Sequence, residues 1–300
     1  MLLYFDDERD AALRLAEAAS LPASRIERHR FPDGELKLRL PAGLPAAVTI
    51  YRSLDNPNEK LVELLIVSQT ARSLGAERLV LVAPYLAYMR QDMEFTPGEA
   101  VSQRIVGRFL AQIFDGIVTV DPHLHRISRL EEAAPVAHAV VLVGALALSD
   151  YIVGQRSYPL LVGPDAESEQ WVAAAAARHG LDYIACSKVR SGDRNVAVDL
   201  PPARVQGRPA VILDDMASTG HTLAAAAQLL RAAGAASVDA AVTHAMFAPQ
   251  ALDMLRANGI GEIWSTDSIA HPSNAVAMAP TLAQALRDIG AAGRTNPAAG

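Results

Sequence analysis

Short apolar runs alternate with longer helical patterns along almost the whole chain, and this alternation is the strongest constraint on its fold. Several of the helical patterns are followed directly by glycine, the usual residue just past a helix C-terminus. The alternation predicts an α/β fold with mostly parallel sheets flanked by helices. The predicted strands are residues 2–5, 47–51, 78–83, 116–120, 159–162, 183–185, 210–213, 238–243 and 262–265. The predicted helices are residues 11–19, 59–74, 100–113, 169–179, 223–233 and 249–257.

The alternation occurs twice, once on each side of about residue 146. A chain of 300 residues has ample length for two domains. We therefore expect an N-terminal domain over 1–146 and a C-terminal domain over 147–290. Residues 291–300, which are rich in alanine, glycine, asparagine and proline, are predicted to be a flexible tail.

Residues 30–40 interrupt the alternation. A turn-forming segment, Phe31-Pro32-Asp33-Gly34-Glu35, is followed by residues that alternate in polarity. This pattern predicts a hairpin arm, and a hairpin tip without further function is the simplest interpretation of the turn.

Composition narrows the classes of function. The net charge of −6 argues against nucleic acid as the main partner. The single cysteine, Cys186, excludes an intrachain disulfide and a multi-cysteine metal site, and it favours a cytoplasmic location. The N-terminus carries acids where a signal peptide has basic residues, and no stretch has the length and apolarity of a membrane span. We expect neither a membrane nor a nucleic-acid partner.

The most informative motif begins after the apolar strand at 209–213, with the acidic pair Asp214 and Asp215. A turn of small and hydroxylated residues follows and leads into an alanine-rich helix. The backbone N–H groups and hydroxyls at this helix N-terminus predict an anion site for one phosphate. The two acids would repel phosphate, so they suit hydroxyls or a metal beside it, which together describe a sugar phosphate such as ribose 5-phosphate. The turn residues are Ser218, Thr219, Gly220, His221 and Thr222.

The alternative is that the acidic pair is only a polar strand exit and helix cap. Its position at the carboxyl end of a buried strand, where open α/β sheets bind ligands, favours a binding site.

Other strand ends carry polar groups as well. Arg90, Gln91 and Asp92 follow the strand at 78–83, and the planar guanidinium of arginine suits a polyphosphate, although a solvated loop has the same composition. His123 ends the strand at 116–120 and is a candidate metal ligand, base or structural residue; His125 is expected to be structural or exposed.

Two features of the second half of the chain supply the remaining candidate site residues. Asp165 follows the strand at 159–162, and an aspartate and a histidine from different strand ends could position one Mg²⁺ on a nucleotide. Lys188 and Arg190 lie two apart on a predicted charged loop and could close over a phosphoryl-transfer centre. An ordinary surface loop is the alternative. Cys186 before them is expected to be a small buried hydrophobe.

Taken in order, these motifs resemble the ribose-phosphate pyrophosphokinase family, the synthetases of phosphoribosyl pyrophosphate (PRPP). The resemblance covers roughly residues 4–273 and extends to Thr243-His244-Ala245-Met246-Phe247. Ser218 and the segment 95–102 are similar to the archaeal-like class of the family.

The resemblance implies two tandem type I phosphoribosyltransferase-like domains. It also implies transfer of the diphosphoryl group of ATP to the 1-hydroxyl of ribose 5-phosphate, giving PRPP and AMP, with Mg²⁺ as cofactor in a dimer-based homo-oligomer of up to six subunits. The implied ATP-binding residues are Phe31, Asp33, Gly34, Glu35, Arg90, Gln91, Asp92 and His123, with the Phe31–Glu35 turn reaching a neighbouring subunit. The implied ribose 5-phosphate residues are Asp214, Asp215, Ser218, Thr219, Gly220, His221 and Thr222. Lys188 and Arg190 would be catalytic, and His123 and Asp165 would hold the metal.

Two segments depart from the family pattern, 124–130 after His123 and 166–171 after Asp165. In the commoner bacterial class these regions form subunit contacts and the ADP and phosphate regulatory site, so we do not expect that regulation here. The alternatives to a working synthetase are a catalytically weak, synthetase-like regulatory subunit, and a phosphoribosyltransferase or PRPP-sensing regulator.

Overall fold

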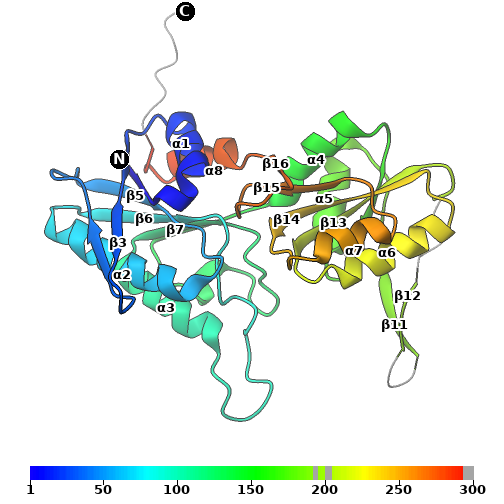
Figure 1. Ribbon diagram of the computed structural model, residues 1–300, viewed down its shortest axis with the longest axis horizontal. Coiled ribbons are helices and arrows are strands. Elements are labelled where there is room, and N and C mark those ends of the chain that lie inside the picture. Colours follow the sequence, from blue (N-terminus) through cyan, green and yellow to red (C-terminus); the bar gives the residue numbers. More distant parts are fainter. Residues whose placement is uncertain (192–194, 200–204, 293–300) are drawn as a thin grey trace, which may run out of the picture. The chain divides into compact units, whose positions relative to one another are not determined.

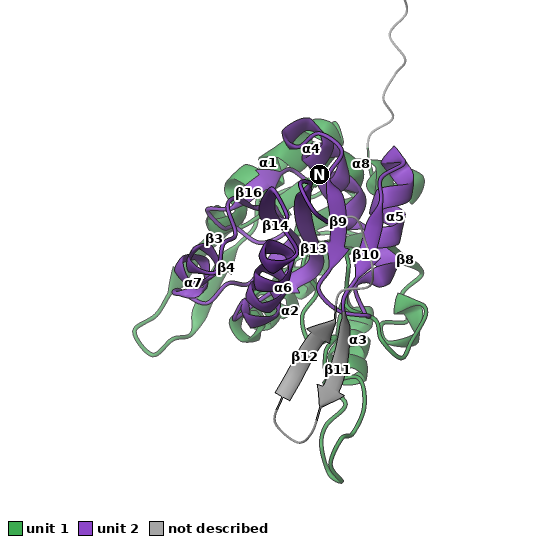
Figure 2. Cartoon of the chain, turned by 90° about the vertical axis from the view of Figure 1, so that its right-hand side faces the viewer, with its two compact units in different colours: residues 1–142, 278–300 green, residues 143–277 purple. Residues whose placement is uncertain are grey.

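The computed structural model describes residues 1–191, 195–199 and 205–292, and between residues 187 and 199 it describes the backbone alone. The chain forms two compact units, shown in different colours in Figure 2. Unit 1 consists of Met1–Leu142 and Met278–Gly300, and unit 2 consists of Val143–Ala277.

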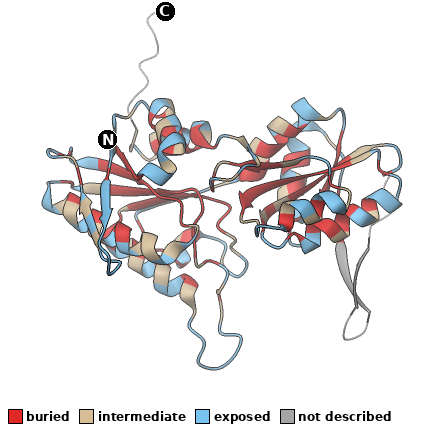
Figure 3. Cartoon of the chain, viewed as in Figure 1, coloured by how far each residue is buried: buried red, intermediate tan, exposed pale blue. Residues whose placement is uncertain are grey.

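A six-stranded sheet in the order β2-β1-β5-β6-β7-β8 forms the centre of unit 1, and every neighbouring pair in it is parallel. Its central strands β6 and β7 are apolar almost throughout, because a parallel sheet covered by helices is buried on both faces (Figure 3). The strands are β1 (Leu2–Tyr4), β2 (Ala23–Arg25), β5 (Ala47–Tyr51), β6 (Arg78–Ala83), β7 (Gly116–Val120) and β8 (His138–Leu142). The helices are α1 (Arg9–Ala18), α2 (Pro57–Ser73), α3 (Ser102–Ile113) and α8 (Ala279–Asp288), with 3₁₀ turns η1 (Asp6–Glu8) and η2 (Leu130–Glu132).

The hairpin arm of unit 1 consists of β3 (Glu27–Arg30) and β4 (Leu36–Arg39), an antiparallel pair separate from the main sheet (Figure 1). β4 packs beside α2. The tip is closed by hydrogen bonds that the Phe31 and Gly34 N–H groups donate to the Glu35 and Phe31 carbonyls, at 2.8 and 2.9 Å. Gly34 has φ of 93°, a conformation that glycine adopts without strain.

Unit 2 has the same architecture, a parallel sheet in the order β10-β9-β13-β14-β15-β16. Alternate residues of the central strand point to opposite faces: Ile212 belongs to one apolar core with Leu230, and Val211 belongs to another with Leu148 and Trp264. The strands are β9 (Leu160–Gly163), β10 (Tyr183–Ala185), β13 (Pro209–Ala217), β14 (Ser237–Ala245), β15 (Ile263–Thr266) and β16 (Asn274–Val276). The helices are α4 (Gly144–Gln155), α5 (Glu169–His179), α6 (His221–Ala232) and α7 (Ala251–Ala257). An antiparallel pair, β11 (Ser187–Ser191) and β12 (Asn195–Asp199), extends from β10.

The α/β class with parallel, helix-flanked sheets is confirmed, but the sequence pattern did not predict every element or its place. α4 is apolar over most of its surface, so it lacks the 3.6-residue alternation that marks a half-buried helix. The chain passes between the units after Leu142, a few residues before the predicted position near 146. α8, placed by its sequence position in a domain over 147–290, packs against α1 in unit 1. The predicted tail lies outside the described residues from 293 onward.

Candidate functional site

The acidic pair of unit 2 lies within β13, which continues four residues beyond the predicted strand end at residue 213 and ends at Ala217. β13 lies between β9 and β14, so the pair lies at the carboxyl edge of the middle of the sheet, the edge where α/β proteins bind ligands. Asp214 is partly exposed, whereas Asp215 is buried, and the Asp215 N–H group donates a hydrogen bond to Asp214 Oδ1 at 3.0 Å.

The turn after β13 forms the predicted helix N-terminus. Ser218 and Thr219 are exposed, α6 begins at His221, and among the described residues no side chain caps its first turn. No acidic residue lies in that first turn, so its N–H groups and the positive end of the helix dipole suit an anion. Gly220 has φ of 78°, which residues with a side chain rarely adopt, and a Cβ atom there would lie 3.2 Å from the Leu255 side chain, so the position favours glycine.

Asp165 joins the same sheet edge, two residues after β9. Its Oδ1 atom accepts hydrogen bonds from the backbone N–H groups of Glu167 and Ser168, at 3.1 and 3.2 Å, which fix the start of α5. Burial raises the pKa of Asp214 well above its usual value, and the carboxylates of Asp215 and Asp165 raise it further. The predicted ribose site and the predicted second-half metal ligand are therefore electrostatic neighbours in unit 2.

Cys186 is buried, as predicted, and its N–H group donates to the Gly163 carbonyl at 2.8 Å. Burial, with a smaller contribution from Asp165, raises its pKa to about 11, so the thiol stays protonated. Lys188 and Arg190 lie on β11, where a loop was expected, and pair in register with Val198 and Val196. The side chains of Lys188 and Arg190 lie outside the described residues.

In unit 1, Arg90, Gln91 and Asp92 follow β6 as predicted, but their side chains differ in role. Arg90 is exposed. Gln91 Nε2 donates to the Met93 carbonyl at 3.0 Å, and buried Asp92 accepts hydrogen bonds from Arg126 at 2.8 and 2.9 Å. Asp92 therefore anchors the segment that follows β7, a role that its sequence position did not indicate.

His123 and His125 lie together in that segment. Their Nε2 atoms are 2.5 Å apart, and the rings are nearly perpendicular, with centroids 4.0 Å apart. His123 is partly buried and His125 is exposed. His125 was expected to be structural or exposed; it is exposed, and it also pairs with the predicted metal ligand.

The arm tip presents the other predicted nucleotide contacts. The Phe31 side chain is 39% exposed, although it is large and apolar, and it packs edge-on against His29 with ring centroids 4.9 Å apart. The Glu35 N–H group donates to Asp33 Oδ1 at 3.1 Å, which orders the turn. An exposed aromatic side chain on an ordered tip is suited to contact a partner or a ligand.

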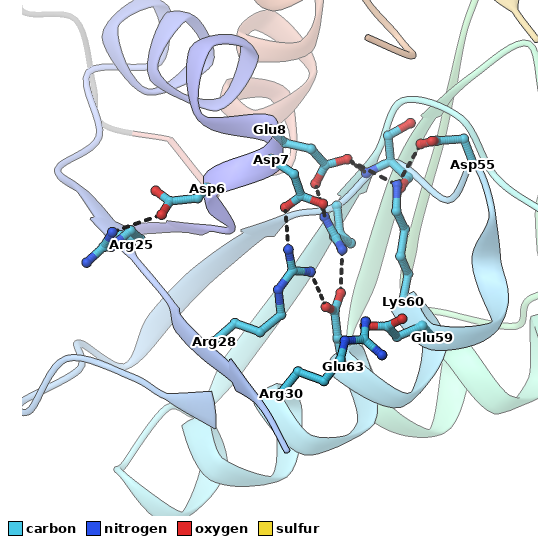
Figure 4. A network of polar contacts seen from close by, with 12 residues as sticks. Asp6, Asp7, Glu8, Arg25, Arg28, Arg30, Asp55, Glu59, Lys60 and Glu63 are labelled. Carbon is cyan, nitrogen blue, oxygen red and sulfur yellow. Dashed lines mark hydrogen bonds and ion pairs between the residues drawn. The ribbon is translucent and has the colours of Figure 1, made fainter. Parts of the chain in front are cut away.

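A buried ionic network joins the base of this arm to the carboxyl edge of the unit 1 sheet (Figure 4). Arg52, which directly follows β5 and is 1% exposed, donates to Asp7 at 2.9 Å, Glu8 at 3.0 Å and Glu63 at 2.5 Å. The other Glu63 oxygen accepts from Arg28 of β3 at 2.5 Å. The run of acids at Asp6–Glu8 was noted in the sequence, but nothing in the pattern paired it with an arginine 44 residues away from Glu8.

The positive charges near Glu8 do not fully offset the burial of its carboxylate. Burial raises its pKa to about 7, against the opposing effects of Arg52 and Lys60. Lys60 lies 3.8 Å from Glu8 as an ion pair, and it donates hydrogen bonds to the Ser53 carbonyl at 2.7 Å and to Asp55 at 2.6 Å.

Among the described residues, no group of three or more histidine, cysteine, aspartate or glutamate side chains is placed to hold a metal ion. Across the same described ranges, no helix combines the length and apolarity needed to cross a membrane.

Two parallel, helix-flanked sheets, one with an acidic pair and hydroxylated turn at its carboxyl edge, define a protein of the phosphoribosyltransferase type. Residues 138–258 match the model of the phosphoribosyl transferase domain, and residues 1–113 match the model of the N-terminal domain of ribose phosphate pyrophosphokinase. The chain belongs to the ribose-phosphate pyrophosphokinase family.

Curated relatives and a solved structure agree with this assignment. The ribose-phosphate pyrophosphokinase of Methanopyrus kandleri is 35% identical over 279 residues, covering 92% of this chain and 94% of the relative. Ribose-phosphate pyrophosphokinase 1 of Archaeoglobus fulgidus is 36% identical over 279 residues, covering 92% of this chain and 95% of the relative. The crystal structure of the phosphoribosylpyrophosphate synthetase from Mycobacterium smegmatis matches with a TM-score of 0.83 and 25% identity, over 96% of this chain and 98% of that one.

Proposed function

We propose that this protein transfers the β,γ-diphosphoryl group of ATP to the 1-hydroxyl of ribose 5-phosphate, producing PRPP and AMP. The observation that carries the proposal is the match to ribose-phosphate pyrophosphokinases at 35–36% identity along both units rather than along one domain. A phosphoribosyltransferase would require only the fold of unit 2. That alternative would not explain why residues 1–113 match the N-terminal domain of ribose phosphate pyrophosphokinase.

Ribose 5-phosphate is assigned to the edge of the unit 2 sheet. Its phosphate accepts hydrogen bonds from the turn at Ser218–Thr222 and the first N–H groups of α6. Its ring hydroxyls donate to Asp214 and Asp215. The exposed turn, the uncapped helix N-terminus and the partly exposed Asp214 carboxylate support this assignment.

ATP is assigned to unit 1. Arg90 is exposed beyond β6 and suits the phosphates, whereas Asp92 orders the site through Arg126. Gln91 and His123 also contact the phosphates of ATP. The arm tip, residues 31–35, contacts the adenine of a nucleotide bound by a neighbouring subunit, which requires a dimer-based homo-oligomer. The exposed Phe31 ring supports that part of the proposal.

In the transfer step, the 1-hydroxyl oxygen attacks the β-phosphorus and gives up its proton to solvent, while the bond between the β-phosphorus and the α,β-bridging oxygen breaks and AMP leaves. Phosphoryl transfer depends chiefly on positioning and charge neutralisation, so no strong base is required. Lys188 and Arg190 stabilise the charge on the transferring group. Bound Mg²⁺ would neutralise the polyphosphate, with His123 and Asp165 as its protein ligands.

The decisive experiment is an assay of AMP formation from ATP, Mg²⁺ and ribose 5-phosphate, with PRPP identified by mass. Equal amounts of AMP and PRPP that depend on the sugar phosphate would establish the synthetase. Binding of ATP without turnover would favour the alternative, a catalytically weak regulatory subunit. The altered segment at 166–171 would then be the first place to restore the family sequence.

A further inference from the structure

A buried histidine at the carboxyl end of β14 has no role in the proposed chemistry. His244 is fully buried, and its Nδ1 atom lies 2.9 Å from Oγ of Ser268, which is 1% exposed. The Ser268 hydroxyl donates its one hydrogen to the Thr243 carbonyl at 2.8 Å, so the His244 Nδ1–H group is the donor to Ser268. The Thr266 hydroxyl donates to the same carbonyl at 2.6 Å. Buried polar side chains therefore tie the end of β14 to the end of β15.

The segment directly after β14 holds the backbone of the sugar-phosphate turn. The Met246 N–H group donates to the Ala217 carbonyl, and the Ala248 N–H group donates to the Ser218 carbonyl, both at 3.0 Å. In a planar trans peptide, the carbonyl and the N–H group of the next residue point in opposite directions. These two hydrogen bonds therefore direct the N–H groups of Ser218 and Thr219 away from the segment after β14.

We propose that His244 is a positioning residue for the phosphate of ribose 5-phosphate. Through Ser268 it fixes the end of β14, and residues 246–248 then fix the direction in which the N–H groups of the turn face the phosphate. The inference rests on the proposed function, which assigns that phosphate to this turn. Hydrogen bonds weaken steeply as they lose alignment, so a small change in the direction of the N–H groups is expected to weaken binding.

Direct binding of ribose 5-phosphate tests the inference without reference to catalysis. Calorimetry compares the wild type with His244→Leu, which removes the donor, and with His244→Asn, whose side-chain amide can donate to Ser268 from a position close to that of Nδ1. Ser268→Ala removes the acceptor and decides the test if the leucine variant does not fold. The matched control is Ser149→Ala, because the Ser149 hydroxyl is equally buried in unit 2 but donates to the Leu146 carbonyl of α4, at 2.9 Å. Tryptophan fluorescence in urea measures the stability of unit 2 in every variant.

We expect His244→Leu and Ser268→Ala to weaken ribose 5-phosphate binding about tenfold, the effect of losing one hydrogen bond to a charged oxygen. His244→Asn should recover most of the affinity, and ATP binding should stay constant in all variants. Ser149→Ala should lose stability without losing affinity for the sugar phosphate. Wild-type affinity in His244→Leu or Ser268→Ala would overturn the inference, as would an equal loss in the control, because the effect would then follow stability alone.

The outcome is separable from that of the proposed function. PRPP formation together with unchanged ribose 5-phosphate binding in Ser268→Ala would leave the synthetase and remove the role of His244. Weakened ribose 5-phosphate binding in that variant, with no PRPP formed by the wild type, would leave the role of His244 and remove the synthetase.

Discussion

Replacing Arg52 by methionine tests whether the buried ionic network of unit 1 stabilises the fold. The guanidinium is 1% exposed and is the shared partner of Asp7, Glu8 and Glu63, of which Glu63 is fully buried. Removing one partner of a buried ion pair typically costs about 3–5 kcal/mol, because the remaining charge is left desolvated.

We expect the cost of replacing Arg52 by methionine to lie at the low end of that range. Glu63 keeps its bond to Arg28, and Glu8, whose pKa is already about 7, can take up a proton instead of remaining charged. We therefore expect a loss of about 3 kcal/mol from the free energy of unfolding of unit 1.

Both tryptophans, Trp171 and Trp264, lie in unit 2, so their fluorescence does not report unit 1. Hydrogen exchange of β5 and α2 in increasing urea is the suitable measurement. Arg25→Met is the matched control, because its pair with Asp6 has side chains 52% and 61% exposed and should contribute less than about 1 kcal/mol. Equal stability of the two variants would refute the argument that burial gives the network its strength.

Three further predictions concern the proposed site. Lys188→Ala should lower turnover by orders of magnitude with little change in ATP binding, because its interaction strengthens in the transition state; unchanged turnover would remove the role. Asp214→Asn should raise the ribose 5-phosphate concentration needed for half-maximal rate, and normal saturation would place the sugar elsewhere. Phe31→Ala should raise the ATP requirement while the ribose 5-phosphate requirement stays constant, and the reverse pattern would contradict the assigned contact with adenine.

The sequence predicted the sheet strands that alternate cleanly with helices, because burial on both faces leaves a continuous apolar run such as residues 78–83. It located the turn that begins at Ser218 for a similar reason, since small polar residues separate a strand from a helix, although His221 and Thr222 already belong to α6. It predicted no helix at Ala279–Asp288 and assigned that segment to the C-terminal domain, because position along the chain does not show which sheet a segment covers. Nor did it pair Arg52 with Glu63 or His123 with His125, since side-chain contacts depend on the path of the backbone rather than on residue type.

Asp7 at the unit 1 sheet edge and Asp214 at the unit 2 sheet edge differ in how their charge is balanced, and this difference supports the proposed sugar site in unit 2. At the unit 1 edge, burial of Asp7 is outweighed by Arg52 and Arg28, so its pKa is lowered. At the unit 2 edge, burial and neighbouring carboxylates raise the pKa of Asp214. A raised folded-state pKa contributes stability at low pH that is lost as pH rises through it, so the Asp214 carboxyl group destabilises ligand-free unit 2 near neutrality. Asp214→Asn should therefore stabilise unit 2 at neutral pH, measured by tryptophan fluorescence in urea, while weakening sugar binding. A variant that gains stability and loses sugar binding would show that Asp214 is retained for its ligand. A variant that loses stability would show instead that Asp214 stabilises the fold.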